Sequence, residues 1–371
     1  MNDAALEIYQ AISDLNKRLK QGSFTDIAEA VAHNLGNQEL HTILSSMLVN
    51  ASLRHRNSDL THRLVNVERI ETSSMSSIQM PVGMVSSDGS AILGRDGFMF
   101  LIGGSNDVLA QYAPTRPGDL DVATQWIALV DNRLERAAQA GVRFHQVIVP
   151  EKISILPDLY PTPISSPTRL LDHIEAEMRD RHGSAIYTSV RGIFWSLADR
   201  TIACRRADSH LSPYGTYLVF KHLMNELFDL RIPAYRFDKA TATIGDLSYR
   251  MIGLFVPEIF YEVDTADLPH FCDGVEKSDE YIPEDGSHMG RRQIWKNPKA
   301  PIDEKVVVFG NSFFSFAENG QGTLSWWFAR WFREFHFVWT NEIDWDYVVN
   351  EKPGVVFWQG IERFLGVIPQ Q

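Results

Sequence analysis

The chain has 371 residues, with 35 basic and 47 acidic side chains and a formal net charge of −12 at pH 7. This length allows one large α/β domain with an appendage, or two domains, and it excludes a single small module. The acidic balance and the lack of a Lys- or Arg-rich run argue against nucleic acid and anionic membranes as partners.

The N-terminal segment 1–75 is predicted to form a helical appendage. Apolar side chains in 8–19 and in 43–48 follow the stripe of an amphipathic helix. The segment 71–78 is polar, serine-rich and without periodicity. It therefore marks the predicted boundary with a main domain at 76–371.

The residues that open the sequence carry neither the basic nor the apolar region of a secretory signal. No stretch approaches the roughly eighteen apolar residues of a membrane-spanning helix. We expect a cytoplasmic protein from the sequence as given, and a periplasmic one if an N-terminal signal has been removed from it.

From about residue 90, helical and extended patterns alternate along the chain. A helix that should end at Gly141 has one apolar face, formed by Trp126, Leu129, Val130 and Leu134. The apolar run 144–149 follows and reads as a buried strand. This alternation predicts a three-layer α/β/α sandwich with a mainly parallel sheet.

Two Ser-Pro pairs predict helix starts, with the serine as N-cap and the proline at the first helical position. Ser166-Pro167 should begin a helix that runs to Arg181. Ser212-Pro213 should begin another, with an apolar stripe formed by Tyr217, Phe220, Met224 and Leu227. The segment Asp208-Ser-His210 would then lie in the loop before the second helix.

The C-terminal part contains a buried strand at 305–309 that ends in Gly310-Asn-Ser312. After Ser312 the pattern predicts a helix through Trp326, Trp327 and Trp331, and then strands at 335–339 and 354–358. A serine on a tight turn between a buried strand and a helix has an exposed hydroxyl close to backbone N–H groups. Those groups can hold an oxyanion.

These residues suggest acyl-transfer chemistry. Ser312 would attack an ester carbonyl, His210 would remove its proton, and Asp208 would fix the imidazole tautomer and stabilise the imidazolium. Gly310 would allow the sharp turn. The alternative is an ordinary strand-to-helix turn in which Ser312 serves as an N-cap.

Six short segments between about residue 90 and residue 366 occur in the order of a known family. They are Gly94-Arg-Asp-Gly-Phe-Met-Phe100, Val147-Ile-Val-Pro-Glu-Lys152, Asp208-Ser-His210-Leu-Ser-Pro213-Tyr-Gly215, Gly245-Asp-Leu247, Phe309-Gly-Asn-Ser-Phe313 and Glu362-Arg363. In these segments the chain resembles the SGNH-hydrolase-like domain of the alginate O-acetylation proteins, the AlgX and AlgJ family. As in that family, the Asp-x-His segment precedes the serine, the reverse of ordinary SGNH esterases.

The resemblance implies an O-acetyltransferase. Ser312, His210 and Asp208 would be catalytic, and an acetyl group would pass through an acetyl-serine to a sugar hydroxyl of a polysaccharide or its precursor. No cofactor would be bound, but an acetyl donor would be required, either acetyl-CoA or an acetylated partner. A protein partner in a polysaccharide-modification system is also implied, although no glycine-rich phosphate loop identifies a CoA site.

Two positions depart from the family pattern. Asn311 stands where the family has aspartate, and Leu211 stands where it has tryptophan. Two alternatives therefore stay open beside acetyl transfer: a carbohydrate acetylesterase that uses the same three residues with water as acceptor, and a non-catalytic relative that binds a glycan or a partner protein.

The weaker candidates for substrate binding or for the oxyanion are Gly310, Asn311, Asn106, Gln359, Trp358 and Arg363. Asn106 resembles an oxyanion-hole asparagine of ordinary SGNH esterases, but we interpret its segment as a loop. Trp358 and Gln359 stand at the carboxyl end of the last strand, where α/β sheets bind ligands. Lys152 and Arg363 suit an acidic sugar, although we favour a structural role for both.

The remaining aromatic, histidine and cysteine residues favour structural roles. The other tryptophans suit stacking on sugars, but their spacing favours core packing. His145 and His336 lie within predicted strands and are expected to be buried. No histidine pair stands at ligand spacing, so no metal site is predicted. Cys204 and Cys272 are expected to be buried free thiols, with one isolated disulfide as the alternative.

Overall fold

The computed structural model describes residues 81–370 except 105, 115 and 252–256. The predicted helical appendage and its boundary at 75/76 lie outside the described residues. The rest of the chain divides into two compact units. One contains the described residues up to Phe100 with 206–208 and 240–260, and the other contains 101–205, 209–239 and 261–371.

The first unit is built around short extended segments. The hairpin of β1 (Ala91–Leu93) and β2 (Met99–Leu101) contacts residues 206–208, because the Met99 N–H donates to the Arg206 carbonyl at 2.8 Å. The backbone of Gly245 also packs directly against this segment. A Cβ there would lie 2.0 Å from the Ala207 carbonyl oxygen, so this close approach requires a glycine.

A second two-stranded sheet joins β5 (Phe237–Ile244) and β6 (Pro257–Val263). Neither strand appears in the sequence prediction.

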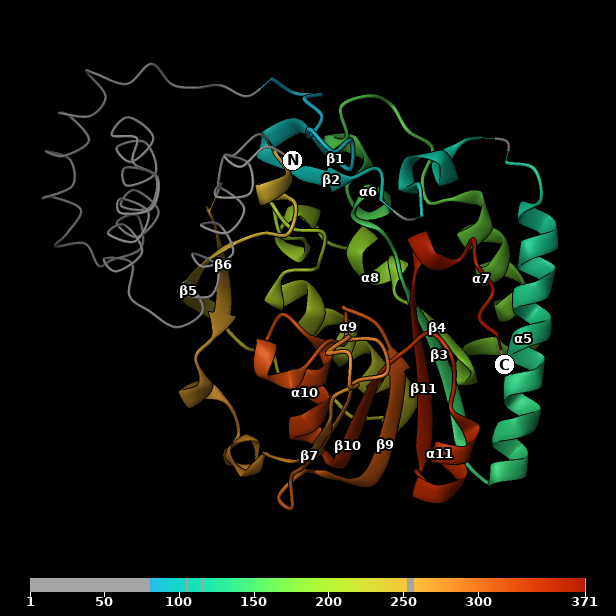
Figure 1. The fold of residues 1–371 in the computed structure, drawn as a ribbon. Coiled ribbons are helices and arrows are strands. Elements are labelled where there is room, and N and C mark those ends of the chain that lie inside the picture. The colour runs from blue at the N-terminus through green and yellow to red at the C-terminus, as the bar shows by residue number, and fades with distance from the viewer. Residues whose placement is uncertain (1–80, 105, 115, 252–256, 371) are drawn as a thin grey trace, which may run out of the picture. The chain divides into compact units, whose positions relative to one another are not determined.

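The second unit contains a seven-stranded sheet in the order β4-β3-β11-β9-β10-β8-β7 (Figure 1). Its strands are β3 (Arg143–Val149), β4 (Tyr187–Ser189), β7 (Glu276–Tyr281), β8 (Arg292–Lys296), β9 (Ile302–Gly310), β10 (Phe332–Trp339) and β11 (Val355–Ile361). The five strands from β4 to β10 are parallel, whereas β8 and β7 are added antiparallel at one edge. The mainly parallel sheet is therefore confirmed.

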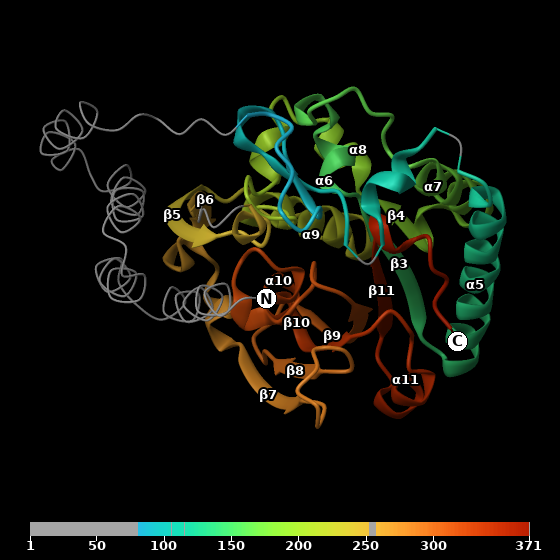
Figure 2. The same cartoon turned by 45° about the horizontal axis from the view of Figure 1, so that its top comes forward.

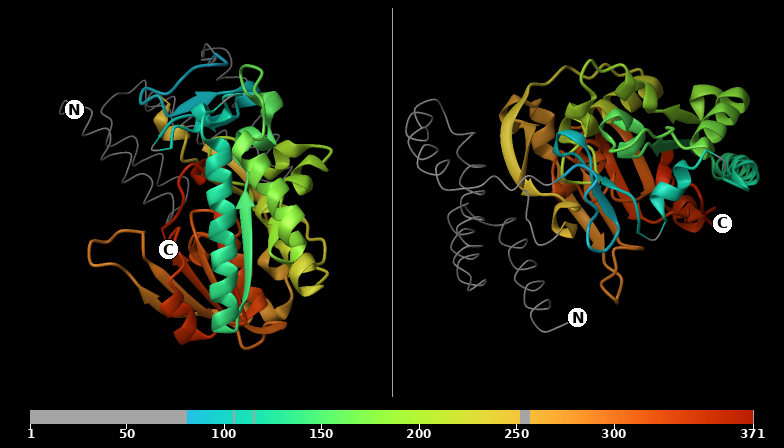
Figure 3. Two further views of the ribbon diagram at one scale, coloured as in Figure 1. Left: turned by 90° about the vertical axis from the view of Figure 1, so that its right-hand side faces the viewer. Right: turned by 90° about the horizontal axis from the view of Figure 1, so that it is seen from above.

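Three helices cover one face of this sheet: α5 (Asp119–Ala140), α7 (Arg169–His182) and α11 (Trp345–Glu351). Their apolar side chains form one core with inward-facing residues of β3, β9 and β11. Figure 3 shows α5 lying along β3, and Figure 2 shows α5 and α7 at the β4 end of the sheet, opposite β7.

The other face carries α9 (Pro213–Phe228) and α10 (Leu324–Trp331). Phe328 of α10 contacts the rings of Phe335 and Phe357, with centroids 5.9 and 5.5 Å apart. Phe220 of α9 packs on Phe328 in turn. Side chains that alternate along each strand thus supply two cores, and the predicted three-layer arrangement is confirmed.

Two short helices, α6 (Lys152–Ile155) and α8 (Arg191–Trp195), follow β3 and β4. Among the described residues, no helix combines the length and the apolar composition needed to cross a membrane.

The ends and N-caps of three helices match the sequence predictions in part. The helix ending before Gly141 and the helix capped by Ser212 are confirmed, and the Ser212 hydroxyl accepts the Gly215 N–H at 3.0 Å. The cap assigned to Ser166 is wrong. Helix α7 begins at Arg169, because the hydroxyl of Thr168 accepts the Leu171 N–H at 3.3 Å.

The helix predicted directly after Ser312 is also misplaced. It begins only at Leu324, with Thr323 as its N-cap, so the alternative role of Ser312 as an N-cap is wrong. The carbonyls of Phe313 and Phe314 instead accept the first N–H groups of α10, those of Leu324 and Ser325, at 3.1 and 3.2 Å. The segment after Ser312 therefore loops out and returns to the helix start.

The predictions for buried polar residues are confirmed where the structure describes them. Cys204 and Cys272 are buried free thiols, and burial raises their pKa values to about 12 and about 11. His145 and His336 are buried in strands, and burial lowers the pKa of His145 to about 4.

Candidate active site

The carboxyl ends of the parallel strands gather several of the predicted residues at one edge of the sheet. Phe309 of β9 lies opposite Trp358 of β11, and Ile361 of β11 lies opposite Val149 of β3. The segments that follow these strands, which begin at Asn311, Glu362 and Pro150, therefore leave the sheet side by side. Ligands of open parallel sheets bind at this edge.

The turn that carries Ser312 is fixed by its own backbone. The Asn311 carbonyl accepts the N–H groups of Phe314 and Ser315 at 3.1 and 3.0 Å, and its side-chain Oδ1 accepts the Phe313 N–H at 3.3 Å. Ser315 completes the turn with a left-handed φ of 52°. Ser312 is half-buried, and within the described part of the chain its hydroxyl has no hydrogen-bond partner.

Gln359 supports this turn from the neighbouring strand β11. Its Oε1 accepts the Asn311 N–H at 3.1 Å, and its Nε2 donates to the Gly360 carbonyl at 2.7 Å. A Cβ on Gly310 would lie 3.0 Å from that Oε1, so the glycine leaves room for this contact. Gln359 is fully buried, which makes it a positioning residue for the turn and not a surface for substrate.

His210 lies beside the same turn. Its ring centroid is 5.1 Å from that of Phe313, the residue after Ser312, at an interplanar angle of 47°. The loop is held by an isolated bridge between Cys204 and Leu211, with the Arg205 N–H donating to the His210 carbonyl at 3.2 Å. The structure thus places the predicted base next to the turn of the predicted nucleophile.

Asp208, the predicted orienting acid, belongs to the other compact unit, since the division between the units falls after it in the chain. Its side chain is buried, and its Oδ2 accepts the Asp246 N–H at 3.1 Å. The donor of this contact is a backbone N–H of the Gly245-Asp-Leu247 segment.

The structure corrects the expectation for Trp358. It faces α5, where it packs against Trp126 with ring centroids 5.1 Å apart and lies 4.6 Å from the guanidinium of Arg133. Its indole N–H donates to the Asn341 carbonyl at 2.8 Å. Trp358 is therefore a core residue and offers no face to a sugar.

Arg363 and Asn106 are brought together by a buried glutamine. Gln111 Nε2 donates to the carbonyls of Asn106 and Arg363 at 2.7 and 2.9 Å, which holds the Asn106 loop against the segment after β11. The guanidinium of Arg363 forms an ion pair with Glu151 at 2.6 Å. Asn106 thus lies at the candidate edge, whereas the charge of Arg363 is already compensated.

Glu362 is the residue at this edge whose role the sequence did not reveal. Its two carboxylate oxygens accept the N–H groups of Glu151 and Thr168 at 2.9 and 2.7 Å. Burial raises its pKa, against the opposing effect of these hydrogen bonds. The sequence offers one signal for it, a charged residue that directly follows the largely apolar run 355–361. In the structure this run is a strand that is buried along its whole length.

Three possible metal ligands cluster away from this edge. The ligand atoms of Glu334, His336 and Glu351 lie within 4.8 Å of one another. The ammonium of Lys305 lies 2.8 Å from Glu334 and 2.9 Å from Glu351, and His336 donates to or accepts from Tyr347 at 2.6 Å. This cluster is an ion-paired network in which a lysine already supplies the positive charge.

No model of a known protein family matches the chain, and no curated protein matches it. The structure is similar to the O-acetyltransferase domain of AlgJ from Pseudomonas putida, with a TM-score of 0.48 and 16% identity, over 76% of this chain and 94% of that one.

It is also similar to PatB1 of Bacillus cereus, with a TM-score of 0.48 and 12% identity, over 74% and 97% of the two chains. For AlgX of Pseudomonas aeruginosa the TM-score is 0.40 and the identity 12%, over 73% and 61%. AlgJ and AlgX are also the proteins that give their names to the family that the six sequence segments resemble.

Proposed function

We propose that this chain is a serine-dependent O-acetyltransferase that moves an acetyl group through an acetyl-serine at Ser312 to a sugar hydroxyl of a polysaccharide or its precursor. The observation that carries the proposal is the packing of the His210 ring on Phe313, next to Ser312. Asp208, two residues before His210, is the proposed orienting acid on the basis of the sequence pattern.

The reaction would proceed in two balanced steps. His210 takes the hydroxyl proton as the Ser312 oxygen attacks the acetyl carbonyl, and the imidazolium then returns that proton to the departing donor group. In the second step His210 takes a proton from a sugar hydroxyl, which attacks the acetyl-serine. The imidazolium of His210 returns that proton to the departing Ser312 oxygen, and the acetylated sugar leaves.

Asn311 is the proposed side-chain donor for the oxyanion. Its Nδ2 is buried and has no hydrogen-bond partner among the described residues, while its Oδ1 is used within the turn. An unpaired buried amide beside the nucleophile is costly for stability and is suited to a charge that develops during reaction. Unlike the ionised aspartate of the family pattern, an asparagine amide can donate a hydrogen bond.

The donor and partners follow from where the protein works. A cytoplasmic protein would take the acetyl group from acetyl-CoA, whereas a periplasmic one would require an acetylated partner protein. We propose a carbohydrate acceptor in either case.

The test is intact-protein mass spectrometry after exposure to an activated acetyl ester. We expect one acetyl adduct that maps to Ser312 and that is absent from Ser312→Ala. Ser325→Ala is the matched control, because Ser325 lies near the same turn but is fully buried. An adduct that persists unchanged in Ser312→Ala would overturn the proposal.

Product analysis separates transfer from hydrolysis. With an oligosaccharide present, a transferase converts the adduct into acetylated sugar, whereas an acetylesterase releases acetate at the same rate with or without it. A wild-type protein that never forms the adduct supports the non-catalytic alternative.

A further inference from the structure

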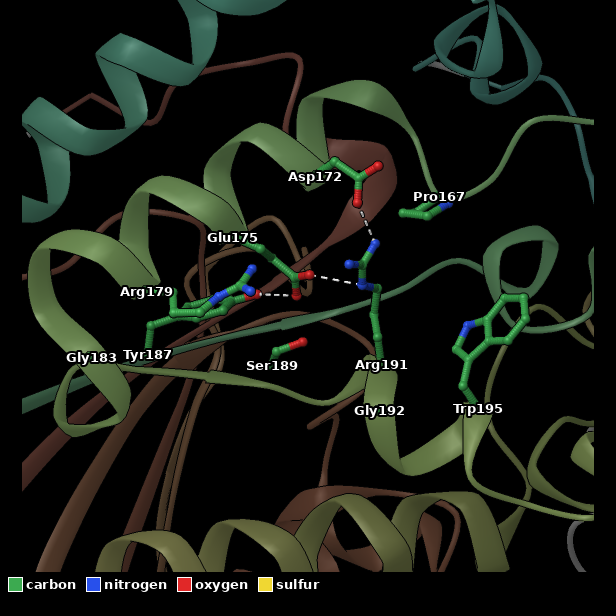
Figure 4. A pocket seen from close by; sticks show the side chains of 10 residues that line it. All are labelled: Pro167, Asp172, Glu175, Arg179, Gly183, Tyr187, Ser189, Arg191, Gly192 and Trp195. Carbon is green, nitrogen blue, oxygen red and sulfur yellow. Dashed lines mark hydrogen bonds and ion pairs between the residues drawn. The ribbon is translucent and has the colours of Figure 1, made fainter.

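A cavity of about 640 Å³ lies beyond the carboxyl end of β4, between α7 and α8 (Figure 4). It is separate from the Ser312 turn, and none of the proposed catalytic residues lines it. Its walls combine charged, hydroxyl and aromatic side chains, namely Asp172, Glu175, Arg179, Ser189, Arg191 and Trp195. β4 and β9, the strand that leads to Ser312, are three strand spacings, about 14 Å, apart in the sheet.

The polar groups of the cavity are held in fixed orientations. Arg191 Nη1 lies 2.6 Å from Asp172, and its Nε lies 2.8 Å from Glu175, as the dashed lines of Figure 4 indicate. Glu175 also accepts the Tyr187 hydroxyl at 2.7 Å. Guanidinium donors and carboxylate acceptors thus lie side by side, and these side chains are already fixed before any ligand binds. This is the arrangement that neighbouring sugar hydroxyls require, because each hydroxyl both donates and accepts.

Trp195 supplies an aromatic surface at the rim. Its side chain is 49% exposed, although the guanidinium of Arg200 lies over its ring at 4.3 Å and is itself paired with Asp158. The ring is thus held in place and half exposed where it lines the cavity. Its apolar face suits the C–H face of a sugar ring.

Charge distinguishes between classes of saccharide. The two carboxylates of the cavity, Asp172 and Glu175, are matched by two guanidinium groups, Arg179 and Arg191, so the lining is neutral overall. The whole chain has a net charge of −12. A polyanionic ligand would gain nothing from the neutral lining and would be repelled by the rest of the molecule.

We infer that this cavity binds a neutral saccharide unit of the acceptor, away from the hydroxyl that is acetylated. The inference rests on the proposed function and specifies its substrate class. Because β4 lies about 14 Å from β9, the strand that leads to Ser312, the cavity would hold another unit of the same chain. Acceptors would therefore be oligomeric and uncharged, and single monosaccharides would be poor acceptors.

The experiment is a calorimetric titration of the whole protein with no acetyl donor present. The probes are oligosaccharides of about six units from partial hydrolysis of cellulose, chitin and mannan, and oligouronates of equal length from alginate. We expect at least one neutral probe to bind, Trp195→Ala to weaken its binding about tenfold or more, and the oligouronates to bind more weakly.

The matched control is Tyr281→Ala. Tyr281 is 51% exposed and lies under the guanidinium of Arg292, but it belongs to β7 at the opposite edge of the sheet. This variant should bind the neutral probe as the wild type does. A second variant, Arg191→Lys, keeps the charge but loses the guanidinium geometry, and it should also bind more weakly.

Three results would overturn the inference: no binding of any neutral probe, equal binding by wild type and Trp195→Ala, or tighter binding of the oligouronates. Because the titration involves no acetyl group, its outcome is independent of whether Ser312 forms an adduct. Failure of the adduct experiment would instead remove the proposed transferase and leave the saccharide site to be judged by binding alone.

Discussion

Glu362 lies where three segments of the second unit meet. Its carboxylate joins the end of β11 to the residue after β3, Glu151, and to the residue that caps α7, Thr168. The same residue belongs to one of the six segments that carry the family resemblance. Its structural role at the sheet edge accounts for its presence there without a part in the chemistry.

Substitution Glu362→Gln tests this role through the pH dependence of stability. Burial raises the pKa of Glu362 from its ordinary value of 4.5. Its contribution is therefore fully present below pH 4.5 and is lost as the pH rises through the higher folded-state value. Because glutamine does not titrate, we expect the wild-type advantage, about 1 kcal/mol at low pH, to shrink as the pH rises.

Denaturant unfolding of both proteins between about pH 4 and pH 8 measures this difference. A wild-type advantage that grows with pH would contradict the assignment.

The candidate site also shows what residue-level reasoning can predict. Ser312 and His210 were selected as complementary chemical groups, and the structure brings His210 to the Ser312 turn. Trp358 and Gln359 were grouped because both stand near a strand end. Consecutive strand residues point to opposite faces, so only one of the two can face the site, and it is Gln359 that contacts the turn.

At the scale of elements, strong periodicity was the reliable signal. The apolar stripes of α5 and α9 and the apolar runs of β3, β10 and β11 are all found as helices and strands. Strands β7 and β8 were not predicted, because the first is almost entirely polar and the second is short. β8 forms by pairing with β10, and β7 by pairing with β8, so neither strand depends on burying an apolar pattern of its own.

The misplaced N-cap of α7 has a local cause. A Ser-Pro pair is a common helix start, but a cap is set by the residue whose side chain reaches the N–H three positions onward. Here that residue is Thr168.

The two serine and threonine positions give a paired test. Thr168→Ala should destabilise the protein by about 1 kcal/mol, because the Leu171 N–H loses its acceptor. Ser166→Ala should change the free energy of unfolding by less than about 0.5 kcal/mol. Both values come from denaturant unfolding monitored by circular dichroism, and equal effects of the two substitutions would contradict the cap assignment.

At the scale of the whole molecule, the division into two compact units was beyond sequence reasoning. One unit collects three stretches that are far apart in the chain, and short runs of backbone such as 206–208 carry no periodicity. Gly245 is a residue whose type reflects this arrangement, because its backbone packs directly against Ala207. Such a contact becomes recognisable only once the two segments are known to meet.

Net charge makes a prediction at the same scale. A neutral saccharide carries no charge for the field of the protein to act on, so raising the salt concentration from about 20 mM to about 500 mM should leave its affinity unchanged. The affinity of an oligouronate should rise over the same range, because salt screens the repulsion from a chain with a net charge of −12. Calorimetry at the two salt concentrations measures both, and a falling oligouronate affinity would indicate attraction instead.

The central position of β11 in the sheet has a consequence for folding during synthesis. It is synthesised after the other strands of its sheet, yet it inserts between β3 and β9. It also carries Gln359 and leads into Glu362. Until β11 inserts, two parallel strands lack a neighbour, and the Asn311 N–H lacks its acceptor. The turn that carries Ser312 therefore lacks this support until β11 has been synthesised and has inserted into the sheet.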